Sequence, residues 1–502
     1  MTNQIITADI TLLLEGTYPF VRGGVSGWVH QIIEGLPQFK FSLIFLGAKQ
    51  SDYDDLKYPL PANVVNLECH YLWEPISLSK PKACSGNKDY VIDAMKLHDW
   101  FKNQSNNCSD ALINKVLTTM GKPNGFTAEE FFYSEAAWQT ICESHLETCS
   151  DESFIAYFWT IRAMHSPLFK LAKIAHQLPA SGAFHSASSG YAGFLGALLT
   201  NITGRPFILT EHGIYTKERK IDLQSLFIQE HNDHFDDALT HGMSYQNKLW
   251  IHYFESLGRL TYRFSDPIIS LYEKNRQRQI TDGADASRSM VIPNGMEPNK
   301  FLSIRENRPE KTPMVVGLLG RIVPIKDIKT FIRAMRSVVT QIPEAEGWLI
   351  GPEDEDQEYV EECKNLVKSL GLENNVRFLG FQKITNVLPQ LGLMVLTSIS
   401  EAFPLVLLEA FASGIPVVTS DVGACREIID GKSPEDRALG SAGLVVPIAD
   451  PEATAKAILT LLMDNQRWRA AQQTGIQRVE KFYTQAEVLS RYAETYEKAI
   501  HS

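Results

Sequence analysis

Short apolar runs recur along the chain, and amphipathic stretches separate them. Four runs lie in the first half and six in the second: ITLLLEG, FSLIFLG, GAFHSAS and FILTEHG, then MVVGLLG, EGWLIGP, VRFLGF, LMVLTS, PVVTSD and AGLVVP. Runs of this length between turn residues are typical of strands that are buried on both faces. Strands that alternate with helices predict two parallel sheets, each covered by helices on both faces.

Two stretches show the spacing of amphipathic helices. After the first strand come Tyr, Pro and glycines, and then Trp28, Val29, Ile32 and Ile33 recur on one helical face. At the other end of the chain, TQAEVLSRYAETYEKAI carries an apolar stripe from Val488 to Ile500, with Thr484 before it as a candidate N-cap. We expect this last helix to bury its stripe, and packing against the N-terminal domain would achieve that.

The alternation of predicted strands and helices indicates how the chain is divided into domains. Residues 50–150 interrupt it with segments such as LHDWFKNQSNNCSDALINKVL, which predict a mainly helical insertion. The segment IPNGMEPNKFLSIRENRPEKTP is rich in Pro, Asn and charge and is the best domain boundary. We therefore expect an N-terminal domain over 1–296, a C-terminal domain over 297–482 and a final helix over 483–502.

Composition narrows the class of protein. The chain has 502 residues, 44% of them apolar and 21% charged, with a net charge of −11. This length predicts at least two domains, and the acidic balance argues against nucleic acid as a partner. The seven cysteines form no CxxC pair, and neither a signal peptide nor an apolar segment long enough for a membrane helix is recognisable. We expect a soluble, cytoplasmic protein.

Glycines stand where the first strand gives way to the first helix. Gly23 and Gly24 would let backbone N–H groups approach a ligand, and a helix N-terminus attracts anions. A phosphate cradle is one interpretation, and a tight glycine turn explains the same residues equally well.

A second candidate phosphate site follows the first strand of the second series. In VGLLGRIVPIKD, Arg321 offers a forked donor and Lys326 a mobile point charge, a combination that suits a diphosphate. Taken alone, such a pair is better interpreted as two solvated surface cations.

Two glutamates flank the start of an apolar helix. In SEAFPLVLLEAFASGIPVV, Glu401 precedes the helix, Pro404 suits its first turn, and Glu409 lies within it. Carboxylates at these places can accept hydrogen bonds from the hydroxyls of a ribose or a hexose. A dipole-stabilised Glu and a second Glu on a wet face would give the same pattern, but the apolar surroundings of Glu409 make free solvation unfavourable.

As a set, these motifs resemble the retaining GT-B glycosyltransferases of family 4. The resemblance covers nearly the whole chain and is densest over residues 290–480, where SGIPVVTSDVGACREII follows the two glutamates. The first 30 residues look closer still to the PelF-type enzymes of Pel exopolysaccharide synthesis. The resemblance implies an α/β GT-B fold: two Rossmann-like parallel-sheet domains that face a central cleft, with a helical insertion in the first.

The resemblance also implies roles for residues of the second domain. Arg321 and Lys326 would clamp the donor diphosphate and stabilise the charge of the leaving nucleotide, while Glu409 would bind the ribose. Glu401 would hold hydroxyls of the donor sugar, and the backbone at Ala402 and Phe403 would approach the same sugar.

In the first domain, the resemblance places Gly23 and Gly24 beside the diphosphate. The family histidine near the donor sugar falls at His185, and His212 in TEHG is a second candidate. Either histidine, taken alone, could be a satisfied structural residue. Asn294 and Gly295 match a family loop near the domain boundary.

Two residues depart from the family pattern. Asp327 follows the phosphate lysine where Gly is usual, and an acid there would weaken phosphate binding unless it pointed away. Ala402 follows the first glutamate where Gly is frequent, and its methyl group would narrow the approach to the sugar. Neither change removes a chemical group that the reaction needs.

The stretch EHNDHFDDALTHG gathers five residues of metal-binding type: His231, His234, Asp236, Asp237 and His241. No HExxH pattern is present, and a polar helix face is the preferred interpretation. Enzymes of this family generally need no metal.

The sequence therefore predicts a retaining hexosyltransferase without a cofactor. It would use a nucleotide diphosphate sugar, UDP-glucose or a related UDP-sugar, and a growing Pel-like exopolysaccharide as acceptor, beside an inner-membrane synthase complex. Two alternatives stay open. One is a non-catalytic sugar-nucleotide-binding subunit of a polysaccharide synthase, and the other is a GT-B enzyme of different chemistry, such as a glycogen-synthase-like extender or an epimerase.

Overall fold

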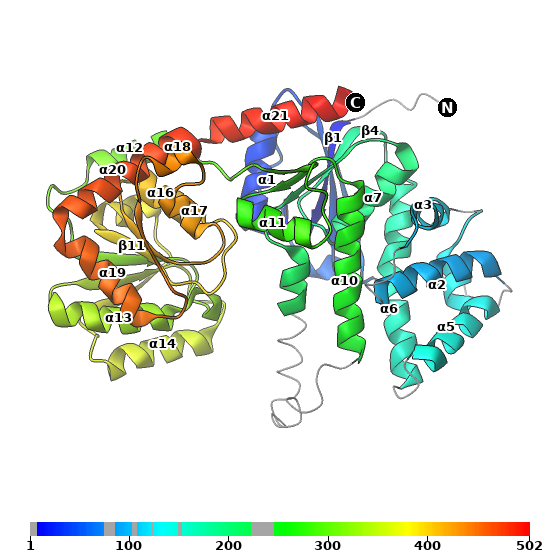
Figure 1. Cartoon of the computed structure of the whole chain (residues 1–502), viewed down its shortest axis with the longest axis horizontal. Coiled ribbons are helices and arrows are strands. Elements are labelled where there is room, and N and C mark those ends of the chain that lie inside the picture. Colours follow the sequence, from blue (N-terminus) through cyan, green and yellow to red (C-terminus); the bar gives the residue numbers. More distant parts are fainter. Residues whose placement is uncertain are drawn as a thin grey trace. The chain divides into compact units, whose positions relative to one another are not determined.

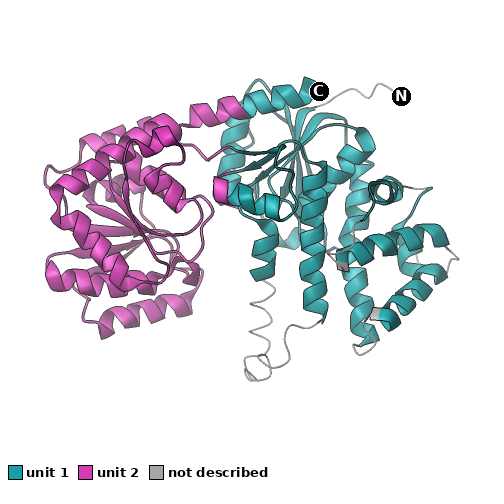
Figure 2. Cartoon of the chain, viewed as in Figure 1, with its two compact units in different colours: residues 1–270, 275–291, 492–502 teal, residues 271–274, 292–491 magenta. Residues whose placement is uncertain are grey.

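The computed structural model describes residues 8–74, 86–102, 108–122, 124–148, 153–221 and 245–501 (Figure 1). The chain forms two compact units (Figure 2). Unit 1 comprises residues 1–270, 275–291 and 492–502, and unit 2 comprises residues 271–274 and 292–491.

Unit 1 is built on a seven-stranded parallel sheet. In the order β3-β2-β1-β4-β5-β6-β7, its strands are β3 (Val64–Tyr71), β2 (Phe41–Gly47), β1 (Ala8–Glu15), β4 (Ser181–Ser186), β5 (Phe207–Glu211), β6 (Ile268–Ser270) and β7 (Ser289–Val291). The four strands predicted in the first half of the chain are confirmed as β1, β2, β4 and β5. Three strands were missed, because β3 and β7 are edge strands with partly exposed side chains and β6 has only three residues.

Helices cover this sheet. They are α1 (Gly24–Gly35), α2 (Lys88–Lys102), α3 (Asp110–Thr119), α4 (Ala128–Tyr133), α5 (Glu135–Thr148), α6 (Phe154–Ala175), α7 (Tyr191–Thr203), α10 (Tyr245–Phe264) and α11 (Glu273–Thr281). The predicted apolar face of α1 is confirmed, since Trp28, Val29, Ile32 and Ile33 are all buried.

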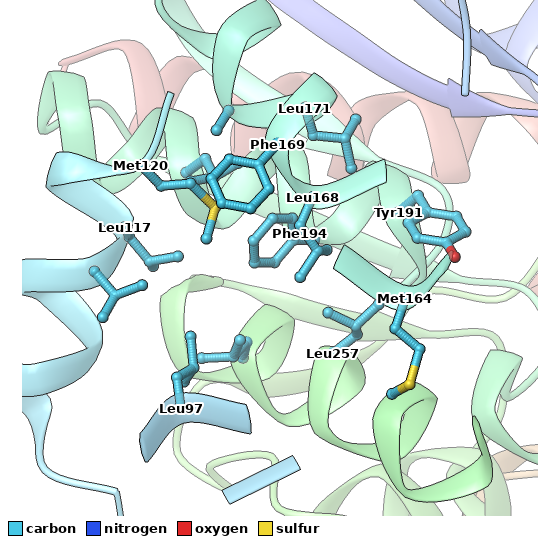
Figure 3. Close-up of a cluster of buried hydrophobic side chains, with 14 of the residues drawn as sticks. Leu97, Leu117, Met120, Met164, Leu168, Phe169, Leu171, Tyr191, Phe194 and Leu257 are labelled. Atoms are coloured by element: carbon cyan, nitrogen blue, oxygen red, sulfur yellow. The ribbon is translucent and has the colours of Figure 1, made fainter. Parts of the chain in front are cut away.

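The inserted helices share one apolar core with the sheet domain. Figure 3 shows Leu97 of α2 and Leu117 of α3 packed with Leu168 of α6, Phe194 of α7 and Leu257 of α10. Helices thus lie between β3 and β4, where the sequence analysis expects an insertion over about 50–150, and they pack on the core. The strand β3 belongs to the sheet, and the helices run from Lys88 to Ala175.

Unit 2 contains a six-stranded parallel sheet of order β10-β9-β8-β11-β12-β13. The strands are β10 (Val376–Gly380), β9 (Glu346–Ile350), β8 (Val315–Leu319), β11 (Leu393–Leu396), β12 (Val417–Ser420) and β13 (Gly443–Val446). All six strands predicted in the second half of the chain are confirmed. Alternate residues enter two different clusters: Leu393 and Val395 pack in one, Met394 and Leu396 in the other. This alternation shows that both faces of the sheet are buried.

The helices of unit 2 are α12 (Leu302–Glu306), α13 (Ile328–Gln341), α14 (Gln357–Ser369), α15 (Ile384–Val387), α16 (Leu405–Ala412), α17 (Cys425–Asp430), α18 (Pro434–Arg437), α19 (Pro451–Met463) and α20 (Asn465–Phe482). The 3-10 turns are η1 (Gln50–Asp52) in unit 1 and η3 (Pro298–Phe301), η4 (Pro324–Lys326) and η5 (Leu388–Gln390) in unit 2.

The last helix, α21 (Gln485–His501), starts in unit 2 and ends in unit 1. Thr484 accepts a hydrogen bond from the backbone N–H of Glu487, as expected of an N-cap. The side chains of Tyr492 and Tyr496 are fully buried. In the parts of the chain that the structure describes, no helix combines the length and the apolar character needed to cross a bilayer.

Candidate functional site

A lysine and a glutamate meet at the carboxyl edge of the sheet in unit 2. Lys326 ends η4 after strand β8, and Glu401 lies in the loop after β11. The ammonium Nζ of Lys326 lies 2.5 Å from Oε1 of Glu401, and the Ser398 hydroxyl donates to the same oxygen at 2.6 Å. The two charged side chains are only 19% and 14% exposed, so water screens this pair weakly.

The backbone fixes these two loops against each other. The Ile399 N–H donates to the carbonyl of Ile325 at 2.9 Å, and the Thr397 hydroxyl donates to the carbonyls of Lys326 and Asp327 at 2.9 and 3.0 Å. Gly351 permits the crossing of the adjacent turn, because a Cβ there would lie 1.9 Å from the carbonyl oxygen of Gly320. The ends of strands β8, β9 and β11 thus form one rigid platform.

Arg321 leaves the same strand end but turns toward an acid on the surface. One guanidinium nitrogen, Nη1, lies 2.7 Å from each carboxylate oxygen of Glu355. Both side chains are about half exposed, at 55% and 51%. Exposed pairs of this kind contribute about 0–1 kcal/mol, so a competing anion can displace Glu355 at little cost.

The backbone after Glu401 is shaped by a glycine that the sequence analysis did not single out. Gly423 has φ +51°, and a Cβ there would lie 2.2 Å from the carbonyl oxygen of Glu401 and 2.5 Å from that of Ala402. The Ala424 N–H donates to the Ala402 carbonyl at 2.9 Å. Phe403 is buried against Tyr483, with ring centroids 5.9 Å apart. Gly423 and Ala424 thus fix the backbone of the loop at Glu401 and Ala402. The stretch SDVGA, which contains Gly423, was the feature of the sequence that could have indicated this turn.

Glu409 occupies the middle of α16, as predicted, and Pro404 is the N-cap residue immediately before this helix. The side chain is half-buried, and this partial burial raises the pKa of the carboxyl above its usual value. Among the described residues, no hydrogen-bond donor or cation reaches it. Partial burial of an acid without a partner is unfavourable, which marks Glu409 as a candidate ligand contact.

Asn294 and Gly295 lie beside the start of the last helix. Asn294 is buried, and its Oδ1 has no hydrogen-bond partner in the described structure. A Cβ at Gly295 would lie 2.6 Å from the carbonyl oxygen of Thr484, and Met296 exchanges backbone hydrogen bonds with Tyr483 and Gln485. Residues 295–296 therefore pack against the backbone at the start of α21.

Gly23 and Gly24 form the N-terminus of α1 in unit 1. Gly23 is the N-cap residue, and no side chain caps the first turn. A Cβ at either glycine would have no other atom within 4 Å, so internal packing does not require glycine at these positions. No side chain caps the N–H groups of the first turn, which is compatible with an approaching anion.

His185 lies within β4 and is hydrogen-bonded through both ring nitrogens. Nδ1 lies 2.8 Å from the hydroxyl of Tyr496, and Nε2 lies 2.9 Å from Oγ1 of Thr210, which in turn contacts the hydroxyl of Tyr492 at 3.0 Å. Burial and, to a lesser degree, nearby His212 lower the pKa of His185 to about 3. The geometry favours a neutral, structural histidine at this position, because neither nitrogen is left for a substrate.

His212 follows β5 and is arranged differently. Its Nε2 is buried without a hydrogen-bond partner in the described structure, and burial lowers its pKa to about 4. The ring packs edge-on against Trp28 of α1, with centroids 4.6 Å apart. His212 is therefore neutral at physiological pH and keeps one ring nitrogen available.

Two acids in unit 1, the half-buried Glu15 and the fully buried Glu211, were missed by the sequence analysis. Glu15 ends β1 and accepts hydrogen bonds from the Ala192 N–H at 3.1 Å and the Tyr215 hydroxyl at 3.0 Å. Glu211 ends β5 and accepts from the hydroxyl of Tyr262 at 2.8 Å. Burial raises the pKa of both acids. Each acid fixes a loop that leaves the carboxyl edge of the sheet. Their positions at the ends of the predicted strands, in LLLEG and LTEHG, could have indicated them from the sequence.

The five residues of the candidate metal cluster, His231, His234, Asp236, Asp237 and His241, lie outside the described residues. Among the residues that are described, no group of three or more His, Cys, Asp or Glu side chains is arranged to hold a metal ion.

Comparison with known families divides the chain into two parts. A domain of unknown function, DUF3492, matches residues 8–287, and the glycosyl transferases group 1 match residues 299–478. The first match covers more than half of the chain. The second contains Lys326, Glu401 and Glu409.

Curated relatives match mainly in part. An exopolysaccharide phosphotransferase of Streptomyces coelicolor is 33% identical over 41% of this chain and 20% of its own length. An N-acetyl-alpha-D-glucosaminyl L-malate synthase of Bacillus anthracis is 29% identical over 34% of this chain and 42% of its own length. The lipopolysaccharide core biosynthesis mannosyltransferase LpsB of Rhizobium meliloti is 30% identical over 37% of this chain and 52% of its own length. The chain thus spans between one fifth and about half of each of these relatives.

Solved structures match along the whole chain. Anabaena HepE in complex with UDP has a TM-score of 0.58 at 17% identity, with 97% of this chain and 99% of HepE covered. Sucrose-phosphate synthase from Thermosynechococcus elongatus has a TM-score of 0.57 at 18% identity, covering 97% of this chain and 98% of that protein. At these identities the likeness shows the fold. With the two parallel sheets, it confirms the predicted GT-B architecture.

The match over residues 299–478 places a domain of the glycosyl transferases group 1 in the second half of the chain, and the comparisons leave the donor and the acceptor open. The chain belongs to the DUF3492 family and joins that domain to a group 1 glycosyl transferase domain in one GT-B protein.

Proposed function

We propose that the protein is a retaining glycosyltransferase that moves a hexose from a UDP-sugar to a growing exopolysaccharide. The observation that carries this proposal is the arrangement at the sheet edge of unit 2. Lys326, on the turn that follows β8, forms a weakly exposed ion pair with Glu401, on the loop that follows β11. Glu409, which has no partner among the described residues, lies on the next helix, α16. Ligands of parallel α/β sheets bind at this edge.

Lys326 is proposed to hold the diphosphate of the donor. As the glycosidic bond breaks, negative charge grows on the leaving nucleotide, and a fixed ammonium in weakly screened surroundings stabilises that charge. Glu401 keeps Lys326 in place through its Oε1, and its second oxygen is proposed to accept a hydrogen bond from a hydroxyl of the donor sugar. The backbone at Ala402 and Phe403 is proposed to lie along the same sugar.

Glu409 is proposed to accept hydrogen bonds from the ribose hydroxyls. Its burial cost is not offset in the free protein, and two hydroxyl donors would offset it on binding. Arg321 is proposed to exchange its exposed partner Glu355 for the diphosphate, since a diphosphate is the stronger acceptor for a guanidinium.

In unit 1, His212 is the better candidate for contact with a sugar, and His185 is proposed to support it from the core. Only His212 keeps a ring nitrogen without a partner, while both nitrogens of His185 are engaged. The uncapped first turn of α1, at Gly23 and Gly24, is proposed to meet an anionic group of a substrate. Asn294, with its unsatisfied Oδ1, is proposed to contribute at the chain segment that joins the two units.

The reaction is proposed to retain the anomeric configuration by a front-face route. The bond between the anomeric carbon and the phosphate oxygen breaks with its electron pair on UDP. The leaving phosphate accepts the proton of the acceptor hydroxyl, and the acceptor oxygen bonds to the carbon on the same face. Lys326 and Arg321 would supply the electrostatic stabilisation, so we propose that no metal or other cofactor is required.

The choice of substrates rests on similarity. The HepE structures contain UDP, glucose or UDP-glucose, and one curated relative is named for exopolysaccharide. The N-terminal motif EGTYPFVRGGVSGWVHQI resembles PelF. We therefore propose a Pel-like acceptor and a cytoplasmic site of action beside an inner-membrane polysaccharide synthase complex.

The test measures release of UDP from UDP-glucose and other UDP-sugars with an exopolysaccharide acceptor present, in buffer containing EDTA. Lys326→Ala is expected to lower turnover at least about tenfold, or roughly 1.4 kcal/mol of transition-state stabilisation. Arg336→Ala, at an exposed cation on α13, serves as the matched control and should behave like the wild type.

Three outcomes would overturn the proposal in whole or in part. UDP binding without UDP release would indicate a non-catalytic subunit. Formation of a free epimer would indicate different chemistry. Wild-type turnover in a folded Lys326→Ala protein would refute the assigned site.

A further inference from the structure

Unit 1 contains a hollow that none of the residues assigned above lines. It has a volume of about 330 Å³ and lies between α10, α11 and the residues that follow β5. Figure 1 shows α11 beside the upper part of α10. Its lining comes from Thr216 and Lys217 after β5, from Arg259 on α10 and from Arg278 on α11.

The charge of this hollow is opposite to that of the whole chain. Four cationic side chains line it, against two acidic ones, in a protein with a net charge of −11. One acid, Asp282, already holds Arg278, with 2.7 Å between Oδ2 and Nε. Lys217 and Lys220 are exposed, and among the described residues neither has an acidic partner. Two cations are thus left to attract an anion.

The hollow also offers groups suited to hydroxyls. The hydroxyl of Thr281 donates to the backbone carbonyl of Gln277 at 2.9 Å, and its oxygen can still accept a hydrogen bond. The carboxylate of Glu255 is partly buried on the wall. Cations together with hydroxyl and carboxylate acceptors match a ligand that carries both a phosphate and sugar hydroxyls.

The floor of the hollow is rigid. Tyr262 is fully buried and donates its hydroxyl to Oε2 of Glu211, which also accepts from Nε2 of Gln279 at 2.9 Å. Because Glu211 directly precedes His212, the same short segment carries His212 and the first lining residues, Thr216 and Lys217. A ligand in this hollow would therefore contact the segment that positions His212.

We propose that this hollow is a binding site for a phosphorylated sugar, separate from the donor site in unit 2. The phosphate would lie against Lys217, Lys220 and Arg259, and the sugar hydroxyls against Glu255 and Thr281. The shared chemistry is a phosphate ester of a sugar, which could arrive free in solution or at the end of a lipid carrier. This inference does not depend on the proposed transferase reaction.

The experiment uses the full chain saturated with UDP, so that the donor site is occupied. Glucose 6-phosphate, inorganic phosphate and geranyl phosphate are titrated in separate calorimetric runs at low salt. Glucose 6-phosphate is expected to bind more tightly than inorganic phosphate, and its affinity should fall as salt is added. Tighter binding of geranyl phosphate than of glucose 6-phosphate would overturn the sugar ester in favour of a lipid phosphate.

Charge reversal at the two exposed lysines tests the location. Lys217→Glu/Lys220→Glu is expected to weaken glucose 6-phosphate binding at least about tenfold, since two charge-assisted contacts are lost. The matched control Arg333→Glu/Arg336→Glu makes the same charge change at exposed positions of α13 in unit 2 and should leave binding unchanged. Equal losses in both variants, or no binding of any probe to the wild type, would overturn the site. UDP affinity, measured by titrating UDP into each protein before it is saturated, reports separately on the donor site.

Discussion

Replacing Glu409 by Gln is expected to have opposite effects on stability and on nucleotide binding. The substitution keeps the size of the side chain and removes its charge. In the free protein, burial disfavours the carboxylate, and no described partner offsets that cost. A neutral amide is cheaper to bury, so we expect the variant to be more stable by at least about 1 kcal/mol at pH 8. For a unit of this size that corresponds to about 2–4 °C in Tm.

The pH dependence of this effect has a definite sign. Burial raises the pKa of Glu409 in the folded state above its value in the unfolded chain. The unfolded chain therefore loses this proton first, and folding stability falls as the pH rises through the folded-state pKa. The advantage of Glu409→Gln should be largest at pH 8 and should shrink toward pH 5. Thermal unfolding at the two pH values measures it.

Binding should change in the other direction. If Glu409 accepts hydrogen bonds from the ribose, loss of the charge removes about 1.5–3 kcal/mol, or between about tenfold and 150-fold in the Kd for UDP. Calorimetric titration with UDP measures this change, and Glu358→Gln at an exposed position of α14 is the matched control. A folded Glu409→Gln protein that binds UDP within twofold of the wild type would falsify the ribose assignment. A flat difference in Tm across pH would refute the argument from burial.

Two further predictions concern buried contacts outside the transfer chemistry. Tyr496→Phe leaves Nδ1 of His185 without its partner and should cost about 1–3 kcal/mol of unfolding free energy with kcat for UDP release unchanged. Thermal unfolding beside the transfer assay tests this, and an unchanged Tm with a reduced kcat would instead favour a catalytic His185. Asp436→Ala removes the acidic partner of the fully buried Arg478 guanidinium and should lower the free energy of unfolding by about 3–5 kcal/mol. Denaturant unfolding measures this loss, and a value below about 1 kcal/mol would contradict it.

The strands that the sequence predicted are those whose burial is continuous. Leu12 to Leu14 in β1 and the whole of β2 are buried, so their apolar runs stand out from the flanking polar residues. In β3, Val64 to Tyr71 are only partly buried, because an edge strand has a neighbour on one side only. Its composition consequently resembles that of a loop, and the insertion expected over about 50–150 included these residues.

The sequence predicted which residues belong to the candidate site but not which of them contact one another. The spacing of Glu401 and Glu409 placed one acid before α16 and one within it, because the helix is local in sequence. The pairing of Lys326 with Glu401 joins loops 75 positions apart, and no local pattern encodes it. The difference between His185 and His212 depends on Tyr496, which lies 311 positions from His185 and reaches it only through the path of α21.

Asp327 shows how a departure from a family pattern can preserve the site. Asp327, directly after Lys326, has φ +46°, a left-handed conformation that Gly adopts freely and that Asp and Asn tolerate better than other residues. Its carboxylate accepts a hydrogen bond from the backbone N–H of Thr330 at 3.2 Å and so caps α13. An acid that serves the first turn of this helix has a partner there and need not oppose a diphosphate at Lys326. The left-handed backbone conformation beside Lys326 is thus kept, and the carboxylate of Asp327 caps the helix α13.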